Sequence, residues 1–185
     1  MHLELKDIKE AGLNREMVCN AADFPVLVKM EGQEEVRFVA PVIFQLRFQK
    51  LGQLVEVDGH FKSRVNLICG RCLQPYDIDL SGEFAFTFTP HVADENAAEE
   101  GDEVELETDE LGLVYYKDES LELLPPLQDQ LVMALPISPL CSEDCAGLCS
   151  ECGCNLNVEK CHCEKKVFNN KFSALAGLKI ESSDK

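Results

Sequence analysis

The sequence predicts an α+β fold: an antiparallel β-meander or partly closed barrel, with a few helices and a Cys-rich C-terminal lobe. Two observations carry this prediction. Apolar and polar residues alternate over long stretches of the first half of the chain, which is the period of half-buried strands. Seven of the ten cysteines lie between Cys141 and Cys163, in closely spaced couples. We therefore expect a sheet domain over residues 1–136, and the Cys-rich lobe with a terminal helix over residues 137–185.

Three stretches have the strand period of two. Residues 36–48 have an apolar side chain at every even position. Proline cannot donate a hydrogen bond to a neighbouring strand, so Pro41 either breaks this strand or places it at the edge of the sheet. Residues 61–67 and 78–88 alternate in the same way. The dipeptide Asp58-Gly59 is typical of two-residue hairpins and predicts the turn before the second strand.

The remaining segments predict one further strand, over residues 113–116, and three helices. A short helix is expected over residues 14–22. A second helix is capped by Ser120, starts regularly after Pro125-Pro126, and ends at Pro136, since the residue before a proline avoids the helical region. The last helix is expected near the C-terminus, with its apolar face formed by Phe172, Leu175 and Leu178.

Charge excludes one class of function. The 185 residues contain 34 acidic and 17 basic side chains, a formal net charge of −17, so the chain is not a simple basic nucleic-acid binder. Residues 94–110 contain ten acids and no base, which predicts a solvated loop rather than a packed element. The loop is either only solvating or an acidic tether for a basic partner.

The redox state of the cellular compartment determines whether closely spaced cysteines form disulfides or bind metal. Neither a secretory signal pattern nor an apolar run of about 18 residues is present, which predicts a cytoplasmic protein without a membrane partner. A reducing cytoplasm favours metal ligation over disulfide formation for closely spaced cysteines.

Eight cysteines predict two tetrahedral Zn²⁺ sites. Thiolates are the ligands of structural zinc, and a Cys-x-x-Cys turn supplies two of them from one tight loop. In the most economical arrangement, one zinc ion is bound by Cys149 and Cys152 together with Cys161 and Cys163. The second site then consists of Cys69, Cys72, Cys141 and Cys145. Cys19 and Cys154 are left over.

Other uses of these thiols stay open at this point. An iron–sulfur cluster also takes four thiolates, and Cys-x-x-Cys couples occur in redox enzymes and sensors. A catalytic zinc is not expected, because sulfur ligands are in excess and no histidine has ligand spacing. His162, between two cysteines, is interpreted as a spacer.

No dinucleotide, phosphate-loop, serine-hydrolase or zinc-protease motif is present, so neither an enzymatic activity nor a small-molecule substrate is expected.

Several motifs occur in order along most of the chain. They are Cys69-Gly-Arg-Cys72-Leu73, the helix exit Leu135-Pro136, Cys141-x-x-x-Cys145, Gly147-Leu-Cys149-Ser-Glu-Cys152-Gly153-Cys-Asn155-Leu-Asn157, Cys161-His-Cys163 and Phe172-x-x-Leu175-x-x-Leu178. In this order they resemble the YceD family, the bacterial and plastid large ribosomal RNA subunit accumulation proteins. Two features depart from that pattern: Cys154 is an additional thiol, and no proline precedes Phe172.

The resemblance implies a non-enzymatic ribosome-assembly factor that supports the synthesis, processing or stability of large-subunit (23S) ribosomal RNA. A thiol redox enzyme or redox sensor that uses the Cys-x-x-Cys couples is the alternative. An acidic protein reaches RNA either through a local basic face or through a basic ribosomal protein. The cations proposed for such a face are Lys62, Arg64, Arg71, Lys165, Lys166 and Lys171.

Overall fold

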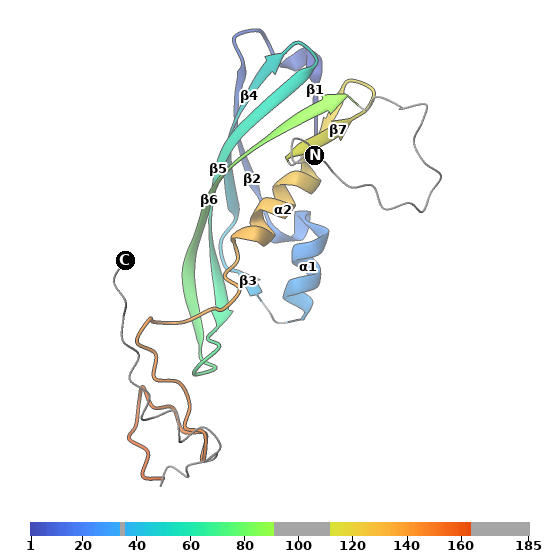
Figure 1. Cartoon of the computed structure of the whole chain (residues 1–185). Coiled ribbons are helices and arrows are strands. Elements are labelled where there is room, and N and C mark those ends of the chain that lie inside the picture. The colour runs from blue at the N-terminus through green and yellow to red at the C-terminus, as the bar shows by residue number, and fades with distance from the viewer. Residues whose placement is uncertain (34–35, 91–111, 164–185) are drawn as a thin grey trace, which may run out of the picture.

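A curved, mixed β-sheet forms the body of the protein (Figure 1). The computed structural model describes residues 1–33, 36–90 and 112–163. Its main sheet has six strands, with the order β2-β4-β5-β6-β7 and β3 paired to β5. The strands are β2 (Leu13–Cys19), β3 (Val36–Phe38), β4 (Val42–Leu51), β5 (Leu54–Ile68), β6 (Pro75–Pro90) and β7 (Leu113–Tyr116). Strands β4, β5 and β6 form the predicted antiparallel meander, whereas β7 runs parallel to β6.

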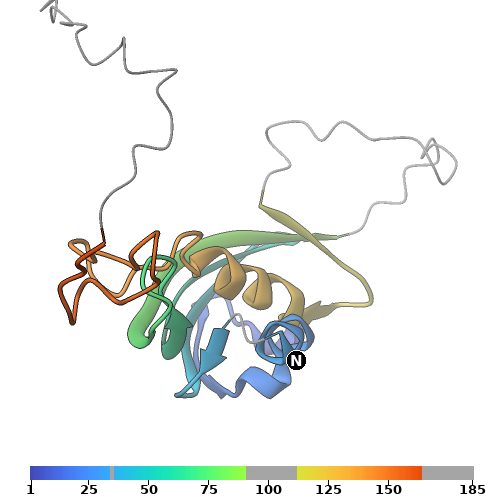
Figure 2. The same ribbon diagram turned by 90° about the horizontal axis from the view of Figure 1, so that it is seen from below.

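Two helices cover one face of this sheet. Helix α1 (Pro25–Gly32) and helix α2 (Leu124–Ala134) lie together in the hollow of the sheet, which bends around them (Figure 2). A two-stranded sheet of β1 (His2–Glu4) and β8 (Ser120–Glu122) lies beside them, and two short 3₁₀ turns, η1 (Leu5–Asp7) and η2 (Ala21–Asp23), complete the described elements. The side chain of Gln128 ties the helices together by accepting a hydrogen bond of 2.9 Å from the backbone N–H of Val26.

The core lies between the helices and the inner face of the sheet. Its largest fully buried side chains are aromatic, and they form a chain of contacts across the strands. The ring of Phe44 lies 5.9 Å from that of Phe61, and Phe61 lies 6.3 Å from Phe84. Leu127 and Leu131 of α2 are also fully buried, so these positions, four residues apart, form the apolar face of that helix. Burial on this scale, at about 1.5–3 kcal/mol for each large side chain, supplies most of the driving force for folding.

The predicted turn at Asp58-Gly59 is wrong. Strand β5 continues through it, and the hairpin turn lies at Gly52-Gln53, between the paired residues Leu51 and Leu54. Gly59 serves packing instead: a Cβ atom there would lie 2.6 Å from the ring of Phe84. Glycine at position 59 therefore allows the Phe84 side chain of the neighbouring strand to approach the backbone of β5, and it does not reverse the chain direction.

Two helix predictions also need correction. Residues 13–19 form the edge strand β2, because this segment pairs with β4 and exposes polar side chains as edge strands do. Ser120 does not cap a helix but pairs with Glu4 in the small sheet, so α2 begins only at Leu124, beside the predicted Pro125-Pro126 start. Its predicted end is confirmed, since Leu135 before Pro136 is already extended.

Barrel closure is not shown. Strands β2 and β7 are the two ends of the pairing path among the described residues, so the described sheet is open. The predicted break at Pro41 and the predicted strand over residues 113–116 are confirmed. The acidic loop 94–110 and the last predicted helix lie outside the described residues.

Strands β5 and β6 position the cysteines. They are the longest strands, and their turn at residues 69–74 projects beyond the helices at one end of the sheet (Figure 1). Residues within 139–148 contact this turn, through hydrogen bonds to Gly70 and Arg71. Across residues 137–163 the structure has one isolated β-bridge, Leu148 to Asn155, in place of helices and strands. Because residues 137–163 have so little regular structure, interactions other than backbone pairing, such as metal binding, must stabilise their conformation.

Candidate metal centres

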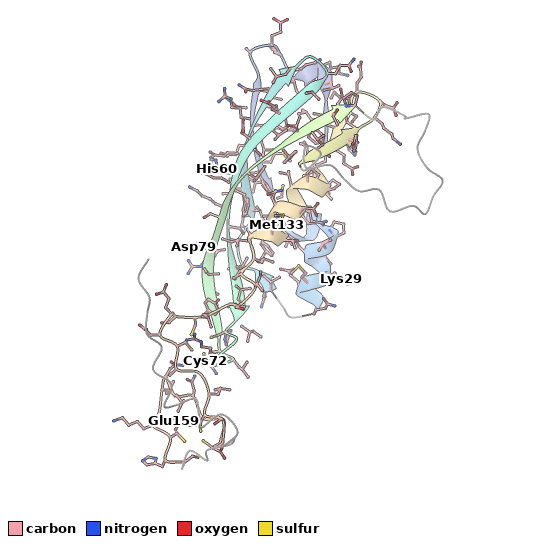
Figure 3. All side chains as sticks on the ribbon, in the orientation of Figure 1. Lys29, His60, Cys72, Asp79, Met133 and Glu159 are labelled. Carbon is pink, nitrogen blue, oxygen red and sulfur yellow. The ribbon has the colours of Figure 1, made fainter. Side chains whose placement is uncertain are left out.

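The first group of thiols joins the tip of the β5–β6 hairpin to the segment after α2. Cys69 and Cys72 come from the hairpin turn, and Cys141 and Cys145 come from the segment that follows α2. The backbone N–H of Gly70 donates to the carbonyl of Pro139 at 2.8 Å, which holds the two segments together. Figure 3 shows Cys72 at this end of the sheet. We call this group the first site.

The first site has the dimensions of a tetrathiolate metal centre. The four sulfur atoms all lie within 4.8 Å of one another, with 3.8 Å between Cys69 and Cys145 and 3.7 Å between Cys72 and Cys141. Four sulfurs at about 2.3 Å from a tetrahedral zinc ion are about 3.8 Å apart. Residues from two distant segments therefore already have the separation that such an ion requires.

Backbone N–H groups prepare the first site for a cation, against the opposing effect of burial. Three of its cysteines are buried, with exposed fractions of 0% for Cys69, 2% for Cys72 and 4% for Cys145. Backbone N–H groups of Cys72 and Cys141 hydrogen-bond the Cys69 sulfur and lower the pKa of this thiol to about 6. Cys69 is therefore largely a thiolate at pH 7, the form in which cysteine binds metal.

The second group lies entirely within the C-terminal lobe. Cys149, Cys152, Cys161 and Cys163 also have all sulfur atoms within 4.8 Å of one another. The sulfurs of Cys152 and Cys161 are 3.6 Å apart, and those of Cys149 and Cys161 are 3.3 Å apart. These thiols are half-buried or exposed, in contrast to the first site. We call this group the second site.

The two Cys-x-x-Cys loops have the same backbone geometry. The N–H two residues after the first cysteine donates to its sulfur at 3.4 Å in both loops, from Arg71 to Cys69 and from Glu151 to Cys149. The loop then ends in a left-handed residue: Gly153, at φ +73°, in one case and Leu73, at φ +57°, in the other. Left-handed leucine costs roughly 1–2 kcal/mol, so the first loop holds strain that the surrounding contacts must maintain.

Two cysteines lie outside both groups, as predicted from their positions. Cys19 is buried in β2, and burial raises the pKa of its thiol. Cys154 lies near the second site, where hydrogen bonding to the Cys152 thiol raises the pKa of Cys154 to about 12. Cys154 is therefore a neutral thiol beside the second site.

The structure places the three described cations of the proposed RNA face along β5 and its turn. Lys62 and Arg64 are exposed, and they alternate along β5 with the buried Phe61 and Val65, so they lie on the face of the sheet opposite the core. Arg64 lies 3.9 Å from both Asp77 and Asp79 on β6, which offsets part of its charge. The Arg71 guanidinium donates to the carbonyls of Glu143 and Cys145 at 3.1 and 3.0 Å, and so braces the first site. The other three, Lys165, Lys166 and Lys171, lie outside the described residues.

Sequence reasoning missed the role of Asn157. Its amide nitrogen donates to the sulfur of Cys145 at 3.4 Å, and its amide oxygen accepts from the backbone N–H of Ala146 at 2.7 Å. Groups that hydrogen-bond metal ligands orient them and adjust their charge. The Asn155-Leu-Asn157 motif was a visible signal, but no spacing rule indicates which thiol its amide contacts.

These features define the class of protein: a curved β-sheet with two helices on one face, carrying a lobe with two groups of four thiols that can each hold a metal ion. Neither α-helix in the described part of the chain is long and apolar enough to cross a membrane.

The chain belongs to the family of the large ribosomal RNA subunit accumulation protein YceD, whose family model matches residues 57–179. An uncharacterized protein of Mycobacterium tuberculosis is 32% identical over 126 residues, which cover 66% of this chain and 55% of the relative. A Mycobacterium leprae protein is 28% identical over 136 residues, covering 71% and 57%.

A plant relative has a functional name. The chloroplastic large ribosomal RNA subunit accumulation protein YCED homolog 1 of Arabidopsis thaliana is 22% identical over 150 residues, which cover 71% of this chain and 46% of the plant protein. The chain thus spans about half the length of the curated relatives it matches. No solved structure matches the chain.

Proposed function

We propose that this protein is a non-enzymatic ribosome-assembly factor of the cytoplasm, which supports the synthesis, processing or stability of large-subunit ribosomal RNA. Two structural zinc ions order its C-terminal lobe, residues 137–185, and the first of them also fastens this lobe to the sheet domain, residues 1–136. The observation that carries the proposal is the pair of four-thiol groups inside the part of the chain that matches the family model.

Zinc is the metal that suits these donors best. Each site offers four sulfurs, so the tetrahedral coordination of the ion is complete and no position remains for a catalytic water. Closed sites of this kind stabilise a fold rather than perform chemistry.

The redox alternative rests on one observation. Backbone N–H groups of Cys152 and Glu151 lower the pKa of the half-buried Cys149 thiol to about 6, as in reactive cysteines. The same N–H groups also stabilise metal-bound thiolates, and the neighbouring sulfurs have metal-site separations. We therefore favour metal binding. Stoichiometric zinc that resists thiol oxidants would eliminate the redox function, whereas reversible disulfide formation in the metal-free form would support it.

The proposed route to RNA is the exposed side of β5. Lys62 and Arg64 point from that strand toward solvent, and Arg71 follows in the turn that carries the first site. Together with Lys165, Lys166 and Lys171, these cations form the proposed contact with phosphates of ribosomal RNA or its precursor. Because Asp77 and Asp79 lie beside Arg64 and offset part of its charge, the contact is weak. As for any phosphate contact, its affinity falls as the salt concentration rises. A basic ribosomal protein is the other proposed partner.

Removing two of these cations tests direct RNA contact. The double variant Lys62→Gln and Arg64→Gln should bind large-subunit ribosomal RNA more weakly, with a salt dependence flatter by about 0.7 log units per lost contact on single strands. Arg71 is left intact because its guanidinium braces the first site. The matched control is Lys6→Gln with Lys9→Gln, which removes two exposed charges near β1.

The measurement is retention of ribosomal RNA by the tagged protein at a series of salt concentrations. Loss of affinity only in the β5 variant supports direct phosphate contact. Unchanged affinity and slope in both variants would rule out that contact and leave a basic protein as the partner. If neither RNA nor ribosomal proteins of the large subunit are retained, the proposed function itself is wrong.

A further inference from the structure

The two metal centres share a three-residue connection. Residues 146–148 separate Cys145 of the first site from Cys149 of the second, so only three residues separate a ligand of one site from a ligand of the other. On one side of this connection, the N–H of Leu148 donates to the carbonyl of Arg71 at 3.2 Å. Arg71 belongs to the first Cys-x-x-Cys loop, so the connection is anchored directly to the first site.

The other side of the connection is held by residues that follow the second Cys-x-x-Cys loop. The N–H of Leu156 donates to the carbonyl of Gly147 at 2.9 Å, and Leu148 forms a β-bridge with Asn155. Gly147 is left-handed, at φ +74°, and a Cβ there would lie 3.1 Å from the carbonyl oxygen of Arg71. The close approach of these segments therefore depends on a glycine at this position.

Asn157 completes the connection through its side chain. Its amide nitrogen donates to the Cys145 sulfur at 3.4 Å and to the side-chain oxygen of Asn155 at 2.8 Å, while its oxygen accepts from Ala146. Within the described residues, the hydrogen bonds that join residues 149–163 to the rest of the chain end on residues 145–147. The second site is thus held in place through the first.

We propose that Asn157 is a positioning residue that couples the two metal centres, so that metal bound at either site raises the affinity of the other. The proposal rests on the proposed metal binding. When the first site is filled, Cys145 and the connection are fixed, which aligns Cys149 with its partners at the second site. By thermodynamic linkage the second site must raise the affinity of the first by the same factor.

An isosteric substitution tests the coupling. Asn157→Asp keeps the oxygen that accepts from Ala146 but loses the donor to both Cys145 and Asn155, and it adds a negative charge beside four thiolates. We expect zinc affinity at the first site to fall about 10–100-fold, the range found for groups that hydrogen-bond metal ligands. The adjacent variant Val158→Ala, whose side chain is 83% exposed, is the matched control and should leave both affinities unchanged.

A double-mutant cycle separates coupling from a purely local effect. Zinc affinity at the first site is measured by chelator competition, with native mass spectrometry counting bound ions, in the full chain with and without Cys161→Ser plus Cys163→Ser. In the otherwise unchanged protein, loss of the second site should weaken the first about 10-fold, within the range of typical couplings. In the Asn157→Asp protein, loss of the second site should have little further effect.

The outcomes distinguish failure of the coupling from failure of metal binding. Equal effects of the double serine change in both backgrounds would overturn the role of Asn157 in the coupling, and no effect in either background would overturn the coupling itself; both results would leave metal binding intact. Failure of the unchanged protein to bind zinc at all would overturn the proposed function instead. If Asn157→Asp does not fold, the same cycle is run with Asn157→Ser, which retains a shorter donor and should show reduced coupling; full coupling in that variant would also refute the proposal.

Discussion

Replacing Cys152 with serine will release metal from the second site and unfold residues 148–163, while the sheet remains folded. The expected loss is large because in small metal lobes the free energy of metal binding, roughly 10–16 kcal/mol for zinc peptides, is folding free energy. Residues 148–163 have one isolated bridge and few buried apolar side chains to replace it. Amide hydrogen exchange should show protection reduced by about 100-fold or more in this segment and unchanged in β4, β5 and β6.

The matched control is Cys154→Ser, the same chemical change two residues away at a cysteine outside both groups of four. This variant should keep its metal and its protection. Unchanged protection across residues 148–163 in Cys152→Ser would contradict the account. Loss of metal in Cys154→Ser, with retention in Cys152→Ser, would instead reassign the ligand.

Acidification will remove metal from both sites. Backbone N–H groups lower the pKa of Cys69 and of Cys149 to about 6, one thiol in each site. Because these pKa values lie below the ordinary thiol value of 9.0, the stabilisation from each thiolate is complete above pH 9.0. It is lost as the pH falls through about 6. Protons and metal compete for the same sulfur, so the metal should be retained at pH 8 and released progressively below about pH 6.

Dialysis at a series of pH values, followed by measurement of bound metal, checks this dependence. Hydrogen bonding to neighbouring thiols raises the pKa values of Cys141 and Cys163 to about 12. These thiols are therefore protonated in the metal-free form, and binding at pH 7 should release protons that a weakly buffered titration detects. Complete metal retention at pH 4, or loss at pH 8, would contradict the assignment of these thiolates as ligands.

Spacing indicates which cysteines form close couples along the chain. Cysteines two to four residues apart can share one ion with little chain entropy cost, so the close couples were predictable. The structure places Cys69 and Cys72 beside Cys141 and Cys145 because the segment after α2 runs to the hairpin tip, where the carbonyl of Pro139 accepts from the N–H of Gly70. Strand alternation was equally informative where one face is buried, as in β4 and β6.

The parts that sequence could not predict depend on contacts between distant segments. Gly59 resembles a turn residue but lies in a strand, because its missing side chain admits the ring of Phe84. Residues 13–19 have no clear period of two, since an edge strand exposes polar groups on both faces. Leu73 adopts a left-handed conformation that leucine does not signal, and the contact between Asn157 and Cys145 depends on the folded lobe.

The central claim is that the lobe of this YceD-family protein is built around two tetrathiolate metal centres. The most direct test is elemental analysis of the full chain, purified without added metal, together with a measured protein concentration. The account predicts two zinc ions per chain, one for each group of four thiols. A zinc content near zero, or iron accompanied by visible absorbance, would contradict it.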